Sequence, residues 1–291
     1  MKFCRMFVYD LKNSLKYNMV IYLLAALVLV LVCMNYGSIA KYYSSVEQFG
    51  AVGYQEYLLN LVRGMEKIPE YSSPKGSSSE NSALGNSVSG NSVPQRQINL
   101  PLAYVGIAIC ISYITGRYIF NNSAYTVLVQ GRSRTAWIVS KSLTTGVEIA
   151  LVYGMMLVVS LLFGGAGGDV EISRCAKLMK IDSVQPQALE QPLFLVLTLL
   201  VPAVTAYAIA QLQIAVSLIF NNVAGFITAI LIYFGSVFEY NLLMLGNGCM
   251  VQRSLYFMDN GLSVKMILLL DMVVIIAAIA AQIAAARKKD W

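Results

Sequence analysis

The chain has 291 residues, of which 57% are hydrophobic and 12% are charged, and its formal net charge is +6. So many apolar residues cannot be buried in a water-soluble core without leaving large exposed patches, so the composition favours a membrane protein. There is no His, which excludes Ser-His-Asp hydrolysis, His general-base catalysis and the usual His-containing zinc sites. The basic residues cluster beside apolar runs, which indicates membrane orientation and not nucleic-acid binding.

Residues 1–18 are expected to form an amphipathic helix on the inner membrane surface. A helical wheel places apolar side chains on one face (Phe3, Phe7, Val8, Leu11, Leu15) and basic side chains on the opposite face (Lys2, Arg5, Lys12, Lys16). Asp10 falls at the edge of the apolar arc and Ser14 inside it. This pattern is typical of an interfacial helix on an anionic leaflet. The alternative is a basic tail that flanks the first span.

Six apolar runs follow, and the sequence predicts one membrane span from each. Pro202 is expected to kink the fourth span, and Asn221 and Asn222 to form a tight turn after it. The predicted spans cover residues 19–34 (or to residue 40 if the helix is tilted), 100–119, 143–163, 192–220, 223–245 and 265–286.

The charge distribution predicts that both chain termini are cytoplasmic. Eleven of the 21 basic residues fall in the three short inner segments, whereas the loop at residues 35–98 has no net charge. Within that loop, residues 72–93 are rich in Ser, Asn and Gly and are expected to be flexible. Residues 238–262 are neither a clean span nor a clean loop, which favours a re-entrant or interface-hugging hairpin outside. The predicted fold is therefore all-α: a polytopic membrane protein with a six-helix domain over residues 19–291.

The connection between the second and third spans, residues 117–141, belongs on the cytoplasmic side. It contains no Asp or Glu and four basic residues: Arg117, Arg132, Arg134 and Lys141. Gly131 is expected to break a helix here, and Ser133 to cap the next one. In that next helix Arg134, Ile138 and Lys141 would share one face. The alternative is an ordinary positive-inside loop.

Three acidic residues fall within or close to predicted spans: Glu148, Glu239 and Asp271. A charge inside the membrane is costly, so each of them should have a partner or face water. We expect Glu148 to pair with Arg117, the alternative being that it reaches the inner interface by itself. Glu239 and Asp271 both belong to the outer third, where they either line an exit path or sit at the outer interface.

The five Cys residues contain no CxxC pair, so neither a metal site nor a dithiol site is indicated. Cys175 and Cys249 are both predicted to lie outside, where a disulfide between their loops is allowed. The sequence also has no G-x-x-x-x-G-K-[ST] motif, so the chain is not expected to hydrolyse ATP by itself.

Gly131, Ser133, Arg134, Ile138 and Lys141 form a pattern of a turn residue, Ser-Arg, an apolar residue and a Lys that enters the third span. This pattern resembles the permease subunits of ABC-2 type transporters. The amphipathic start, the six spans and the interrupted segment before the last span are similar too, so in topology the resemblance covers nearly the whole chain. The chain departs from the family in its long outer loop and at residues 121–123, which read Asn-Asn-Ser where many relatives carry an acidic residue.

The resemblance implies a coupling helix that docks on a separately encoded ATPase, the subunit that would bind ATP and Mg. The residues it assigns to ATPase coupling are Gly131, Arg132, Ser133, Arg134, Trp137, Ile138 and Lys141. It further implies a second permease copy, a location in the bacterial plasma membrane among membrane lipids, and export of a peptide, a lipid or a drug-like amphiphile. It implies no catalytic residue, cofactor or metal in this chain, and no nucleic-acid partner.

Three other functions stay open at this point. An ion-coupled secondary transporter would need buried acidic residues near the membrane midplane and an internal repeat, and the sequence indicates neither. An intramembrane enzyme could use only Ser-Lys or carboxylate chemistry. A sensor or immunity protein could keep the permease fold without transport, and a neighbouring ATPase gene would favour transport or ATPase-linked sensing over the first two.

Overall fold

The computed structural model describes most of the chain, namely residues 2–47, 52–65, 101–119, 133–165, 191–258 and 260–288. These ranges hold helices and short connections; no strand occurs in them, and an isolated bridge joins Ser254 to Leu262. The fold class is therefore all-α, as predicted. In the same ranges four helices are apolar and long enough to cross a membrane, which supports an integral membrane protein: Phe3–Lys41, Arg134–Gly164, Gln191–Ile219 and Val264–Arg287.

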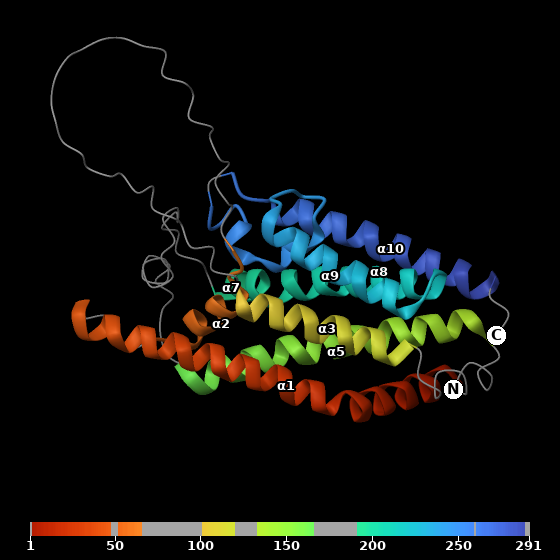
Figure 1. Cartoon of the computed structure of the whole chain (residues 1–291), viewed down its shortest axis with the longest axis horizontal. Helices are drawn as coiled ribbons and strands as arrows, with labels where there is room; N and C mark the ends of the chain where they lie inside the picture. The colour runs from red at the N-terminus through yellow and green to blue at the C-terminus, as the bar shows by residue number, and fades with distance from the viewer. Residues whose placement is uncertain are drawn as a thin grey trace, which may run out of the picture.

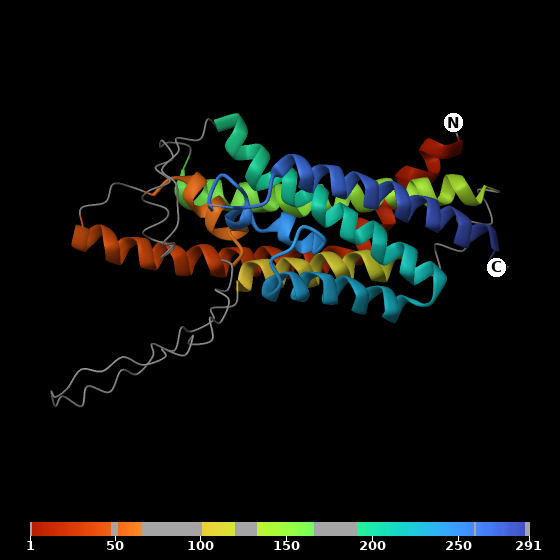
Figure 2. The ribbon, with the colours of Figure 1, turned by 90° about the horizontal axis from the view of Figure 1, so that it is seen from above.

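The long helices lie side by side along one axis (Figures 1 and 2). α1 begins and α10 ends at the same end of this bundle, which we call the terminal end; the opposite end, where α2 lies, is the distal end (Figure 1). The elements are α1 (Lys2–Glu47), α2 (Tyr54–Val62), α3 (Leu102–Ile119), α5 (Arg134–Gly164), α7 (Gln191–Leu195), η1 (Val196–Leu200), α8 (Val201–Ile219), α9 (Asn222–Phe238), η2 (Leu245–Cys249), η3 (Val251–Arg253) and α10 (Val264–Lys288).

α1 is a single helix of 46 residues, so no break separates the predicted interfacial helix from the predicted first span. Its buried side chains recur about one turn apart: Asp10, Ser14, Asn18, Ile21, Ala25, Leu29, Cys33, Tyr36 and Ala40. The first three are polar, whereas Phe3 and Val8 of the predicted apolar face are exposed. Residue 18 is therefore not a helix boundary. The buried polar residues Asp10, Ser14 and Asn18 are followed on the same face by the buried residues from Ile21 to Ala40.

The predicted kink at Pro202 takes the form of a π-helical turn. Val196–Leu200 connects α7 to α8, and Pro202 follows at the start of α8. A proline has no N–H to donate and its ring crowds the carbonyl four residues earlier, so the turn before it widens. α7, η1 and α8 together form one candidate span.

α8 and α9 are joined by the predicted turn. The side chain of Asn221 caps α9 by accepting a hydrogen bond from the backbone N–H of Ala224 (2.8 Å). The two helices approach closely, since a Cβ on Gly225 would meet the Ser217 hydroxyl. α9 ends at Phe238, earlier than the predicted residue 245. The chain that follows is irregular, as predicted, but residues 245–254 are buried in the bundle.

α2 covers the distal end. It buries Tyr57, Leu58 and Leu61, and the Tyr57 ring lies edge-on to that of Tyr36 of α1 (5.3 Å between centroids). α2, which comes from the first part of the predicted outer loop, thus belongs to the main apolar core. Residues 72–93, the part of that loop expected to be flexible, lie outside the described residues.

Candidate functional site

The first turn of α5 is attached to the C-terminal end of α10 at the terminal end of the bundle. Ser133 caps α5, as predicted, because its hydroxyl accepts a hydrogen bond from the backbone N–H of Ala136 (3.3 Å). Arg134 reaches the C-terminal end of α10, where its Nη1 donates to the carbonyl oxygens of Ala286 (3.0 Å) and Arg287 (2.9 Å). A cation is favourable there because the last carbonyls of a helix carry partial negative charge.

Three of the residues assigned to ATPase coupling are buried inside the helix bundle. Trp137, Ile138 and Lys141 are 3%, 0% and 2% exposed. Trp137 and Ile138 pack with residues of α8 and α10 in a small apolar cluster. The physical reason is that this face of α5 turns into the bundle. Gly131 and Arg132 lie outside the described residues, and only Ser133 and the half-buried Arg134 remain near the surface.

Between α1 and α5 lies a set of buried polar side chains that we call the α1–α5 polar cluster. It consists of Asp10, Ser14 and Asn18 of α1 and Ser140, Lys141 and Glu148 of α5, each at most 2% exposed. Lys141 Nζ forms an ion pair with Asp10 Oδ1 (3.2 Å), and Ser140 Oγ donates to Asp10 Oδ2 (2.5 Å).

Glu148 forms the second half of this cluster. Its Oε1 accepts hydrogen bonds from the hydroxyl of Ser14 and from Asn18 Nδ2 (3.1 Å). The expected ion pair with Arg117 is therefore wrong: Glu148 faces α1, whereas Arg117 is exposed on α3 with its guanidinium over the Tyr113 ring (5.9 Å). Because α5 already begins at Arg134, Glu148 also lies close to the middle of this helix.

The two outer acidic residues do not share one environment. Asp271 of α10 is 1% exposed, and its Oδ2 accepts a hydrogen bond from Thr205 Oγ1 of α8 (2.6 Å). Glu239 is exposed at the C-terminal end of α9. Asp271 thus serves the contact between α8 and α10, together with Gln282, whose Nε2 donates to Gln211 Oε1 (3.0 Å).

Arg253, which the sequence reasoning missed, holds the distal end together. Its guanidinium is buried and donates to backbone carbonyls at the end of α9, among them Val237 (2.9 Å), and to Met65 beyond α2 (2.9 Å). It also bonds the side chain of Asn247. Burial lowers the pKa of Arg253 from its ordinary value. A lone Arg in an irregular apolar segment just after a span was the available sequence signal, since helix ends attract cations.

Cys249 carries a free thiol and is buried, so the disulfide with Cys175 that the sequence allowed is not formed. Its Sγ instead faces the carbonyl oxygen of Pro202 (3.5 Å). The physical reason is that η2 is folded into the bundle and not exposed outside it. Cys175 itself lies outside the described residues.

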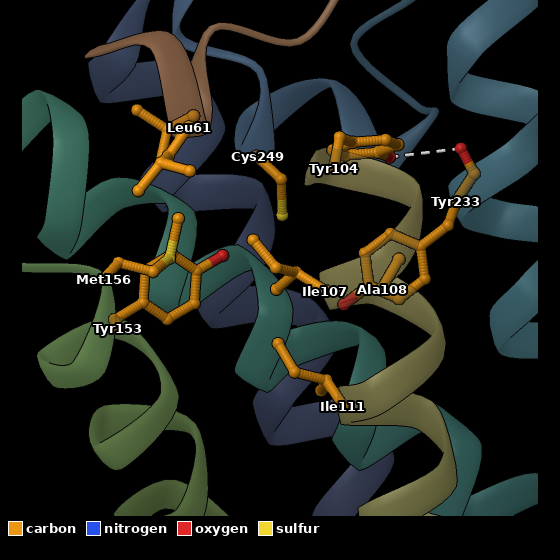
Figure 3. Close-up of a pocket in the computed structure, with 10 residues that line it drawn as sticks. Leu61, Tyr104, Ile107, Ala108, Ile111, Tyr153, Met156, Tyr233 and Cys249 are labelled. Atoms are coloured by element: carbon orange, nitrogen blue, oxygen red, sulfur yellow. Dashed lines mark hydrogen bonds between the residues drawn. The ribbon is translucent and has the colours of Figure 1, made fainter. Parts of the chain in front are cut away.

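A small cavity lies beside Cys249 and is shown in Figure 3. Its volume is about 20 Å³, which is room for one water molecule. Figure 3 also shows the hydroxyl of Tyr104, which donates to the carbonyl of Tyr233 (3.1 Å). This cavity is too small to pass a peptide or a lipid, so the bundle is closed here.

A much larger groove runs along the side of the bundle between α5 and the α7–α8 span. Its volume is about 860 Å³, and its walls are mostly apolar. On α5 the small residues Gly146, Ala150 and Gly154 open the groove, and Tyr153 and Tyr207 also line it. This size falls in the range of pockets that hold small ligands.

Comparisons of the chain with protein-family models, with curated proteins and with solved structures find no match. Among the residues that the structure describes, no three His, Cys, Asp or Glu side chains come together to hold a metal ion. The function therefore has to be argued from the contacts described above.

Proposed function

We propose that the chain is the membrane subunit of an ATP-driven exporter of the ABC-2 type, in which a separate ATPase subunit binds ATP and Mg²⁺. The observation that carries this proposal is the attachment of the start of α5 to both α1 and α10. Lys141 and Ser140 hold Asp10 of α1, and Arg134 holds the end of α10. A push on the segment before α5 would therefore move three helices together.

The roles of the predicted coupling residues then divide into two groups. Gly131, Arg132 and Ser133, with the surface part of Arg134, form the contact with the ATPase. Trp137, Ile138 and Lys141 are buried and transmit the movement into the bundle. Buried side chains suit transmission because a packed interior is stiff and shifts as a unit.

The proposed topology has six spans, both termini in the cytoplasm and the distal end outside. α3 and α9 supply the second and fifth spans, with 18 and 17 residues. At 1.5 Å per residue they are about 25–27 Å long, close to the hydrocarbon thickness of about 30 Å.

The proposed cargo is an amphiphile with an apolar part, such as a lipid or a hydrophobic peptide. The groove between α5 and α8 supports this class because it is wide and mostly apolar, and Tyr207, whose hydroxyl forms a hydrogen bond with Ser142 (2.5 Å), gives it one polar point. It lies on α5, the helix that the ATPase would move. A movement of α5 that the ATPase causes at the terminal end would therefore also move the wall of the groove.

An ion-coupled secondary transporter is the second candidate, and one observation favours it. Glu148 is a buried carboxylate near the middle of a candidate span, the kind of residue that the sequence alone did not place there. A non-transporting sensor or immunity protein remains the third. A transport assay with separate driving forces distinguishes all three.

The chain is reconstituted in proteoliposomes with each ATPase of its genome that lacks a membrane domain of its own, and efflux of a fluorescent lipid is followed. The proposal predicts efflux only with one such ATPase and hydrolysable ATP. Efflux driven by a proton or sodium gradient without ATP would instead establish the secondary transporter. No efflux in either condition, with a bound ATPase, would favour the sensor.

A further inference from the structure

The α1–α5 polar cluster contains one negative charge more than it can balance. Its ionisable members are Asp10, Lys141 and Glu148, all buried. With both carboxyl groups ionised, the cluster carries a net charge of −1 between the two helices. An uncompensated buried charge is strongly unfavourable, so one positive charge is needed in addition to Lys141.

The hydrogen bonds show which carboxyl lacks the counter-charge. Asp10 binds Lys141 directly, and both of its oxygens are occupied, one by Lys141 and the other by Ser140. Glu148 receives hydrogen bonds from the neutral donors Ser14 and Asn18 at Oε1, and the neutral Tyr22 hydroxyl faces it as well. Lys141 acts on both carboxyl groups but can balance only one of them, and it forms its ion pair with Asp10. Glu148 is therefore the carboxyl left without a balancing charge.

Among the described residues, the second oxygen of Glu148, Oε2, is buried without a hydrogen-bond partner. The same holds for Asn18 Oδ1, although the Asn18 amide nitrogen bonds Glu148. Asn18 Oδ1 can only accept a hydrogen bond, and so can Glu148 Oε2 when the carboxyl is ionised. The facing Tyr22 hydroxyl can donate to one of these two oxygens, so one buried acceptor still lacks a donor, and such acceptors are rare.

Other ionisable groups around α5 are engaged elsewhere. On α1 the Tyr22 hydroxyl faces Glu148 and brings no positive charge. On α2 the Glu56 carboxylate accepts a hydrogen bond from Gly53 N (3.1 Å), and on α10 Asp271 is bonded by Thr205. Arg117 of α3 is exposed. None of these supplies the missing charge.

We propose that Glu148 is a proton-binding site: its carboxyl holds a proton while α1 and α5 are packed and releases it when the two helices separate. A proton fits better than a metal cation, because the cluster already contains the Lys141 ammonium, which repels a metal ion. The O–H of the neutral carboxyl adds a second donor beside the Tyr22 hydroxyl, which makes one donor for each of the two unpartnered oxygens. This inference rests on the α1–α5 contact alone and is independent of the ATPase.

The site makes the contact between α1 and α5 depend on pH. Loss of the proton leaves a second negative charge beside Asp10, so raising the pH weakens the contact. Glu148→Gln imitates the protonated form, since its amide nitrogen can donate where the O–H would. This variant is therefore expected to fold, and to keep its stability as the pH rises.

Infrared difference spectroscopy of the full chain in lipid nanodiscs tests the proposal directly. The wild type should show the carbonyl stretch of a protonated carboxyl group at neutral pH, which disappears as the pH is raised. Asp271 is also buried, is bonded only by the neutral Thr205 hydroxyl and has an unpartnered Oδ1, so the spectra are compared in an Asp271→Asn background. There the band should be present, should disappear on adding Glu148→Gln and should be retained on adding the exposed Glu239→Gln. An Asp271→Asn spectrum without this band, or a band that persists after Glu148→Gln is added, would overturn the proposal.

Thermal unfolding supplies an independent readout with protons and Na⁺ as the probes. The wild-type Tm should fall as the pH rises, and this fall should be lost in Glu148→Gln and kept in Glu239→Gln. A wild-type Tm that rises with Na⁺ at constant pH would show a metal-cation site in place of the proton. If Glu148→Gln does not fold, Glu148→Asp keeps the carboxyl, and its infrared band must shift with the shorter side chain for the assignment to stand.

Discussion

At the scale of single residues, the α1–α5 polar cluster works as a set of mutually dependent contacts. Asp10 is accommodated in the interior because Lys141 and Ser140 occupy both of its oxygens. A buried ion pair of this kind adds little net stability, but losing one member leaves the other charge unpaired. Pairs of substitutions are therefore more informative here than single ones.

Asp10→Ala should destabilise the chain by about 3–5 kcal/mol, because it leaves the Lys141 ammonium buried without its partner. Replacing both residues, as Asp10→Ala with Lys141→Met, should recover most of the loss. Reversible unfolding in mixed micelles measures both effects, with the exposed Lys12→Ala as the control. Equal losses in the double variant and the single variant would refute the dependence.

At the scale of elements, the sequence predicted the features of a helix that depend only on residues close to it in the chain. The cap at Ser133, the turn at Asn221 and the disturbance near Pro202 are all local effects of side chains on the adjacent backbone. It did not predict the buried polar face of α1. The helical wheel assigned Phe3 and Val8 to the membrane surface, and they are exposed on the bundle, whereas Asp10 and Ser14 are buried because their partners lie more than 100 residues away on α5.

Partners that are distant in the sequence also explain why the partner of Glu148 was wrongly predicted and why Arg253 was missed. Glu148 was assigned to Arg117 because charge alone was considered, whereas neutral donors on α1 hold it. Arg253 was missed because its acceptors are backbone carbonyls from two distant segments, which no residue pattern reveals. Long-range packing of polar groups decided each of these cases.

The close contact of α8 and α9 provides a test with a matched control. In Gly225→Ala the new Cβ would lie 1.9 Å from Ser217 Oγ and 2.6 Å from the carbonyl of Gln213, so the helices must move apart. We expect a loss of about 1–3 kcal/mol in unfolding experiments. Gly154→Ala, where a Cβ meets nothing within 4 Å, should be neutral or stabilising by up to about 1 kcal/mol.

If Gly225→Ala were as stable as Gly154→Ala, the packing of α8 against α9 at this point would be looser than described, and the turn at Asn221 would have to place the two helices differently.

At the scale of the whole molecule, the terminal and distal ends of the bundle should face opposite sides of the membrane. Thr135 at the start of α5 and Asn241 after α9 are both exposed. In a chain without native cysteines, Thr135→Cys should be protected from a membrane-impermeant maleimide in intact cells, and Asn241→Cys should react. Labelling of both residues, or of neither until the cells are opened, would contradict the six-span arrangement.

The central claim is that a cytoplasmic ATPase acts on this chain through the segment before α5. Its most direct test is co-purification of the chain with each ATPase of its genome that lacks a membrane domain, comparing the wild type, Arg132→Glu and the exposed control Lys12→Glu. The account predicts that one ATPase binds the wild type and the control, and that Arg132→Glu weakens binding at least tenfold while the membrane protein stays folded. Binding that is unaffected by Arg132→Glu, or absent for every ATPase, would contradict it.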